Sequence, residues 1–211
     1  RAAAARVQRH LREGRRVGQP AGAVHLDRPV DHVVQGTGRE ELEERHLDPR
    51  LGPRTIQWAE INGRKYHVIG GRVSHAVVNP TFDPVSPAGA MHDYFRGNPD
   101  QKTPVEFLRD REPIRPEYRD RDARLATMDE HGLEQIWMFP TLGMIYEELL
   151  KHDPEAVALT FTAFNRWLEE DWGFAYRDRI FSAPYVSLCD VDWAVRELEW
   201  ALDHDARTVV M

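Results

Sequence analysis

The side chains best placed for chemistry in this sequence follow a short apolar run, Gln135 to Phe139. Pro140 ends this run, because proline cannot donate the hydrogen bond that a continuing strand needs. The residues from Thr141 to Gly143 then open a loop. In α/β proteins, the loop after the carboxyl end of a strand is where binding and catalytic residues gather. The sequence therefore predicts a strand buried on both faces, followed by a candidate site.

A second group of polar side chains lies in a long segment rich in Pro, Gly and Asp, residues 79–118. His92, Asp93 and Arg96 occur there beside two aromatic residues, and a loop of this length is usually functional. His92 and Asp93 form a weak metal pair, because the side chains of adjacent residues rarely face one ion. The simpler interpretation is an exposed turn that its aromatic residues hold in place.

The elements that would position these residues alternate between strands and helices. Such alternation implies parallel strands with right-handed crossovers, which is an α/β architecture. The predicted elements are a strand at 136–139, a helix at 154–172, a strand at 180–188, a helix at 191–203 and a strand at 208–211.

The long helix at 154–172 has one apolar face. Asp153 and Pro154 mark its start, since Pro is favoured at the first helical position. Asn165 lies beside the apolar face, so we expect it to have a specific hydrogen-bond partner and a structural role. The apolar residues repeat at steps of three and four and are Val157, Phe161, Phe164, Leu168 and Trp172.

Two further strands are predicted before the Pro-rich segment. Thr55–Ile61 and Arg64–Ile69 flank Asn62-Gly63, the preferred pair for a type I′ hairpin turn. The run from Val73 to Val78 can add a third strand, which would complete a small β-meander. Residues 40–44 predict the start of a short polar helix that ends before Asp48.

The first part of the chain has a different composition. Residues 1–57 contain no Phe, Trp or Tyr, so residues 1–38 are expected to be disordered or loosely helical. Residues 1–16 carry six Arg and one Glu, and such a cluster can attract phosphate. Nucleic-acid binding is nevertheless disfavoured, because the arm has no aromatic stacking residue and the chain has a net charge of −7.

Cysteine content and hydropathy favour a cytoplasmic protein. The single Cys189 excludes an internal disulfide and fits a reducing compartment. No apolar run approaches the ~18 residues of a membrane span, so no membrane association is expected. The chain begins with Arg and ends in an apolar run, Thr208–Met211, which we interpret as the sign of a fragment.

Three blocks of the sequence resemble the amidohydrolase-related family, which includes aminocarboxymuconate semialdehyde decarboxylase and related metal-dependent hydrolases. The blocks are RLATMDEHGLEQIWMFPTLG, AFNRWLEEDWGFAYRDRIFSAPYVSL and DVDWAVRELEWALDHDARTVVM, and the resemblance runs from about Leu47 to Met211. It implies a partial (β/α)8 TIM-type barrel. Residues 39–211 would form this incomplete barrel domain, with the meander and the Pro-rich loop as an insertion at about 55–120, and residues 1–38 would be a divergent segment.

The resemblance also implies a divalent metal, usually zinc, that activates water for hydrolysis or decarboxylation of a small carboxylate or amide substrate. The family's first strand carries two ligands separated by one residue, because alternate strand residues point to the same face. At the matching place this chain has Val30-Asp31-His32, which leaves His32 as the candidate ligand. The expected catalytic Asp would lie beyond Met211, so no catalytic residue is assigned.

In such a barrel, Phe139, Pro140 and Thr141 would face the mouth. Phe139 would form an apolar wall, and the Thr141 hydroxyl would hydrogen-bond a substrate carboxylate or amide. Arg96 could clamp an anion, since a guanidinium pairs with a carboxylate through two hydrogen bonds. The alternative is that Pro140 only ends the strand and Thr141 caps the next turn.

Three functions stay open on the sequence. The one we favour is a fragment of a metal-dependent amidohydrolase-like enzyme with a small-molecule substrate, inactive as this chain. The second is a non-catalytic module that pairs with another chain, and the third is a nucleic-acid-binding protein that uses the basic arm. We also expect self-association, because an incomplete barrel would expose the strand edge at 208–211.

Overall fold

The computed structural model describes residues 46–47, 50–61, 64–74 and 83–211, all within one unit of the chain, residues 32–211. Three predictions lie outside these described residues: the disordered segment 1–38 with its candidate ligand His32, the start of the polar helix at 40–44, and the type I′ turn.

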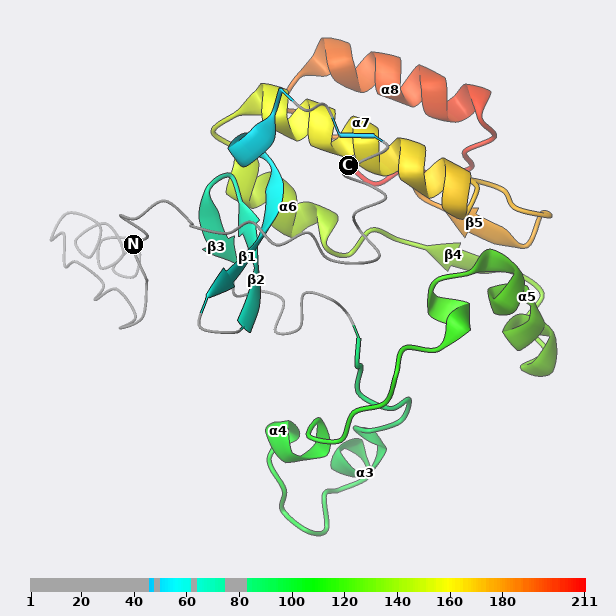
Figure 1. Cartoon of the computed structure of the whole chain (residues 1–211). Helices are drawn as coiled ribbons and strands as arrows, with labels where there is room; N and C mark the ends of the chain where they lie inside the picture. The colour runs from blue at the N-terminus through cyan, green and yellow to red at the C-terminus, as the bar shows by residue number, and fades with distance from the viewer. Residues whose placement is uncertain (1–45, 48–49, 62–63, 75–82) are drawn as a thin grey trace, which may run out of the picture. The chain divides into compact units, whose positions relative to one another are not determined.

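Helices and strands both occur along the described chain, and Figure 1 labels them in order. The strands are β1 (Ile56–Ile61), β2 (Arg64–Ile69), β3 (Arg72–Ser74), β4 (Ile136–Met138) and β5 (Ile180–Ser182). The α-helices are α3 (His92–Phe95), α4 (Pro104–Phe107), α5 (Arg121–Glu130), α6 (Gly143–Leu150), α7 (Pro154–Asp171) and α8 (Val191–Asp203). Short 3-10 helices are η1 (Gly52–Arg54) and η2 (Pro116–Tyr118).

The first three strands form the predicted antiparallel meander. β1 pairs with β2 so that Ile61 lies opposite Arg64, which leaves two residues to connect them and confirms the hairpin. β3 pairs with β2 and places Val73 opposite Val68. The third strand was expected at 73–78 and occupies Arg72–Ser74, while residues 75–82 lie outside the described part.

The predicted parallel pairing is confirmed by β4 and β5. Ile136 lies opposite Ile180, and α6 and α7 connect the two strands along the chain. Beyond β5, Tyr185 and Val210 form an isolated parallel bridge. The strand expected at 208–211 is therefore represented by this single bridge. The described strands thus form one two-stranded and one three-stranded sheet, and the partial (β/α)8 barrel stays a prediction.

The expectation that the strand at 136–139 is buried on both faces is wrong. Trp137 is 49% exposed and Phe139 is 60% exposed. Ile136 and Met138 point the other way and pack against a core cluster built on α5, α7 and α8. The reason is that β5 is the one strand paired with β4 in the described chain, and helices cover one face of the pair.

The helix α6 is not predicted from the sequence, which places only its first residue, Gly143, in a loop and indicates no element for residues 144–150. It begins without a side-chain cap, so the usual sequence signal for a helix start is missing. Tyr146 and Leu150, four residues apart, bury its inner face. The strand expected at 180–188 is shorter than predicted, and its regular part ends at Ser182.

The helix α7 confirms the predicted apolar face and joins two core clusters. Val157 and Phe161 belong to one cluster, and Leu168 and Trp172 belong to the other. Figure 1 shows α8 beside α7, with which it is in contact. Asp153 caps the start of α7 by accepting the Ala156 N–H at 3.2 Å.

The cap of α7 is tied to η1 by an arginine. Arg54 donates two hydrogen bonds of 2.7 Å to the carboxylate of Asp153, and these bonds hold the pKa of that carboxyl below its usual value. Among the described helices, none is both long and apolar enough to cross a membrane.

Candidate functional site

A pocket of about 290 Å³ lies at the carboxyl end of β4, where the sequence predicted a site. Residues from Met138 to Gly143 form one side of it, and α6 and α7 supply most of the remainder. Leu47 and Ile56 complete its apolar lining. The aromatic residues that line the pocket are Tyr118, Phe139, Tyr146, Phe161, Phe164, Trp167 and Trp172.

The pocket lies where β4 ends and the chain turns. The last ladder bond runs from the Ala183 N–H to the Met138 carbonyl at 2.9 Å. Pro140 has no N–H with which to continue the ladder, and the chain turns away through a 2.8 Å bond from the Gly143 N–H to the Pro140 carbonyl.

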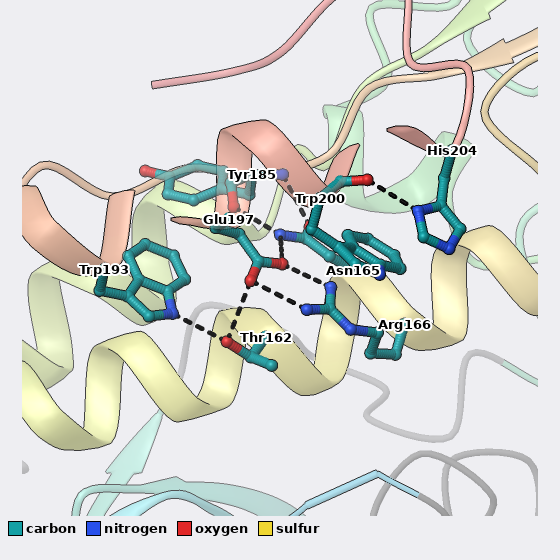
Figure 2. Close-up of polar contacts among 8 residues, drawn as sticks. All are labelled: Thr162, Asn165, Arg166, Tyr185, Trp193, Glu197, Trp200 and His204. Carbon is teal, nitrogen blue, oxygen red and sulfur yellow. Dashed lines mark hydrogen bonds and ion pairs between the residues drawn. The ribbon is translucent and has the colours of Figure 1, made fainter. Parts of the chain in front are cut away.

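The side chain of Asn165 replaces β4 as the partner of the neighbouring strand. The Tyr185 N–H donates to Asn165 Oδ1 at 2.8 Å, and Asn165 Nδ2 donates to the Tyr185 carbonyl at 2.9 Å (Figure 2). On the opposite side, Val210 bonds to the carbonyl of Pro184 and the N–H of Val186. Asn165 is fully buried, and the prediction that it has a specific structural partner is confirmed.

A buried carboxylate fixes the orientation of the Asn165 amide. Glu197, on α8, is 3% exposed and accepts a second hydrogen bond from Asn165 Nδ2 at 2.9 Å. Arg166 donates to both carboxylate oxygens of Glu197, at 2.7 and 3.2 Å, and its guanidinium lies 3.2 Å from the centre of the Trp200 ring (Figure 2). Because its charge is paired and its oxygens are satisfied, Glu197 has the features of a structural residue.

The Tyr185 side chain contacts both α7 and α6. Its ring stacks on Phe161, with 4.2 Å between ring centres, and its hydroxyl donates to Glu147. Ser187 donates to the second oxygen of Glu147 at 2.6 Å. Burial, reinforced by the bond to Glu147, raises the pKa of the Tyr185 hydroxyl. This group therefore stays protonated and serves as a donor.

The structure brings together two of the predicted site residues. Phe139 and Thr141 line the pocket, as expected for the end of a central strand. Arg96 ends α3, is exposed and is not among the lining residues, so its role as an anion clamp stays a prediction. His92 and Asp93 form an exposed pair, with 3.1 Å between Nδ1 and Oδ1, in agreement with the simpler interpretation of that turn.

The sequence does not identify the aromatic residues of α7 as site residues. Helical spacing predicts Phe164 to lie in the core and predicts no role for Trp167. Spacing alone cannot separate a helix face that packs in a core from one that lines a pocket. Thr160, which also lines the pocket and is 2% exposed, carries no sequence signal beyond its place beside the apolar face.

The described residues do not fit the divalent metal that the resemblance implies. No group of three or more His, Cys, Asp or Glu side chains in this part of the chain could hold a metal ion. The lining of the pocket, as far as described residues form it, contains none of these residue types. The candidate ligand His32 lies outside the described residues.

Comparison with solved structures places this chain beside an amidohydrolase. The structure is similar to the crystal structure of an amidohydrolase from Mycobacterium avium subsp. paratuberculosis, with a TM-score of 0.73 and 44% sequence identity. The match covers 80% of this chain and 44% of that protein, so the chain spans less than half the length of its structural relative. No protein-family model and no curated protein matches the chain.

This match confirms the predicted resemblance at the level of the amidohydrolases. An identity of 44% over 80% of the chain goes beyond a shared fold. The narrower resemblance to the aminocarboxymuconate semialdehyde decarboxylase group stays a prediction, as does the use of zinc.

Proposed function

We propose that this chain forms the substrate-binding part of an amidohydrolase-like enzyme, with the pocket at the end of β4 as the site that holds a small molecule. The observation that carries the proposal is the position of this pocket. It lies at the carboxyl end of a parallel strand, in a chain 44% identical to an amidohydrolase over the matched region. That end of the strands is where α/β enzymes bind their substrates.

The chain's own residues would bind and orient the substrate. Phe139 supplies an apolar wall, and the backbone turn after Pro140 places Thr141 beside it. The hydroxyl of Thr141 would donate a hydrogen bond to a carbonyl or carboxylate oxygen of the substrate. Arg96 would reach the site when the segment that carries it closes over the pocket.

A metal, zinc in the first instance, would supply activated water in the intact enzyme, for hydrolysis or for decarboxylation. The described residues offer no cluster of donors for it, so we assign no step to a metal here and expect this chain alone to be inactive. Elemental analysis after dialysis against a weak chelator tests this point. Stoichiometric zinc that is lost in His32→Ala would contradict it and would place a ligand in the N-terminal segment.

The proposed function is tested in a chimera, in which this chain replaces the 44% of the mycobacterial amidohydrolase that it matches. A panel of amides, esters and carboxylates first identifies a substrate of the parent enzyme. The chimera should turn over a substrate from the same panel. Thr141→Val and Arg96→Ala should each lower kcat/KM about tenfold to a hundredfold, since each removes one substrate hydrogen bond or ion pair.

Arg109→Ala is the matched control, because Arg109 is an exposed arginine in the same segment as Arg96 and does not line the pocket. It should leave kcat/KM unchanged. A chimera that folds cooperatively but turns over no parent substrate would contradict the proposed function. Full activity of both site variants would contradict the assignment of their roles.

A further inference from the structure

The described lining of the pocket contains no charged side chain. Its polar groups are the hydroxyls of two Thr and two Tyr residues and the indole N–H groups of two Trp residues. A carboxylate or ammonium group enclosed there would lose its hydration without gaining a counter-ion, and this costs several kcal/mol. The walls therefore favour a neutral ligand, or the neutral part of a larger one.

The size and the walls of the pocket fit an aromatic ring. A cavity of roughly 150 Å³ is enough to hold benzene, and this pocket measures about 290 Å³. Phe139 approaches it from the turn after β4, and Phe161 and Trp167 approach it from α7. Aromatic side chains can contact a ring on its face or on its edge. One substituted benzene-sized ring is the ligand that this volume accommodates.

One hydroxyl of the lining, that of Thr160, is buried without a hydrogen-bond partner among the described residues. Helical threonines commonly bond the carbonyl four residues earlier, and this hydroxyl does not. A buried hydroxyl without a partner is uncommon in native proteins and is often explained by a missing molecule. Threonine in a helix occupies two χ1 rotamers, so rotation can present this hydroxyl to the pocket.

We propose that the pocket binds a neutral aromatic group with one hydrogen-bonding substituent, and that Thr160 is the residue that recognises the substituent. The identification of this ligand as a substrate rests on the proposed function, whereas its binding does not. Phenol is the simplest probe of this class. Toluene has the same shape without the hydroxyl, and benzoate adds a charge.

Binding is measured on the whole chain by the indole N–H signals in two-dimensional ¹H–¹⁵N spectra. The signals of Trp167 and Trp172, which line the pocket, should shift with phenol. The signal of Trp193 should not, because its indole N–H donates to Thr162 at 2.8 Å outside the lining, and it reports whether each variant is folded. Titration with phenol and titration with toluene should each shift these signals to saturation. Benzoate should bind at least about tenfold more weakly than phenol.

Thr160→Val keeps the shape of the side chain and removes the hydroxyl. The variant should weaken phenol binding about threefold to tenfold, the effect of one hydrogen bond, and leave toluene binding unchanged. Thr127→Val is the matched control, since the Thr127 hydroxyl already bonds the Ala123 carbonyl at 3.2 Å on α5 and does not line the pocket. It should alter the binding of neither probe.

The inference would be overturned by any of three results. These are the absence of Trp167 and Trp172 shifts with both probes, an equal loss of phenol and toluene binding in Thr160→Val, and benzoate binding as tight as that of phenol. The two proposals can fail separately. Phenol binding by this chain together with an inactive chimera would contradict the proposed function alone, whereas an active chimera and no phenol binding would contradict this inference alone.

Discussion

The amide side chain of Asn165 makes both hydrogen bonds that a neighbouring strand would make with the backbone of Tyr185. This relationship links a helix residue to the shape of the pocket. β4 can end at Met138 without leaving buried backbone groups of the next strand unpaired, because α7 supplies one residue that pairs with them. The turn that follows β4 is then free to form one side of the pocket.

The first prediction concerns this pair. Asn165→Ala should lower the free energy of unfolding by about 2–4 kcal/mol, because a buried N–H and a buried carbonyl of Tyr185 both lose their partner. Urea denaturation provides the measurement. Asn98→Ala is a matched control, since Asn98 makes the same two bonds with the backbone of Lys102 at an exposed turn, where water can replace them. An equal loss in both variants would contradict the role assigned to Asn165.

The second prediction concerns Gly143, the first residue of α6. A Cβ at this position would lie 2.7 Å from Cδ2 of the Tyr185 ring, which is held by Phe161 and Glu147. Gly143→Ala should therefore destabilise the protein by about 1–3 kcal/mol, even though Ala is the better helix former by about 1 kcal/mol. In a Tyr185→Leu background the penalty should shrink, which a double-mutant cycle measures. Additive effects would rule out this contact as the cause.

The third prediction is a dependence on alkaline pH. The pKa of Tyr185 is raised in the folded protein, by burial first and then by the hydrogen bond to Glu147, above the value of about 10 in an unfolded chain. The stabilisation is therefore complete below pH 10 and is lost as the pH rises from there toward the folded pKa. Thermal unfolding from pH 8 to pH 11 should show a shallower alkaline decline in Tyr185→Phe. Identical declines in the wild-type protein and in Tyr185→Phe would exclude Tyr185 as the source of the alkaline loss of stability.

The elements of this part of the fold could be predicted from the sequence. The pairing of the Asn165 side chain with the backbone of Tyr185, in the place of a strand, could not. Helical spacing identified α7, and the alternation of elements identified the parallel pairing of β4 with β5. The polar residue on the buried side of α7, Asn165, pointed to a hydrogen-bond partner. Its identity depends on where α7 lies against β5, and a single sequence does not encode such a distance in any local pattern.

The sequence likewise predicts some of the residues that line the pocket and not others. Phe139 and Thr141 could be placed at its mouth because the end of a strand is visible in the sequence as an apolar run followed by Pro140. Thr160 and Trp167 could not, because a helix face that lines a pocket has the same periodicity as one that lies in a core. The exposure of Trp137 was missed because an apolar run looks the same whether helices cover one face of a strand or both.

The fourth prediction concerns self-association. Trp137 on β4 and Phe139, the residue after β4, are about half exposed or more. Trp137 stacks on Phe181 with 4.8 Å between ring centres. An exposed aromatic sheet face of this kind favours association of copies. Light scattering coupled to size-exclusion chromatography should detect species larger than the 24.4 kDa chain.

The variant Trp137→Arg should shift this distribution toward the monomer, since a guanidinium can still stack on Phe181 but repels a second copy. Phe95→Arg is the control, because Phe95 is 80% exposed on α3, away from β4 in the sequence, and its change should have no effect. A wild-type protein that is monomeric at high concentration would contradict the prediction.

The pocket at the carboxyl end of β4 is proposed to be a binding site for a neutral aromatic group. The most direct test is a crystal of this chain soaked with 4-bromophenol, in which the anomalous signal of bromine locates the ligand without prior assumptions. We predict a strong bromine peak inside the pocket, between Phe139 and Trp167, with the phenol oxygen within hydrogen-bond distance of Thr160 Oγ1. Bromine peaks confined to the outer surface, with the pocket unchanged, would contradict the claim.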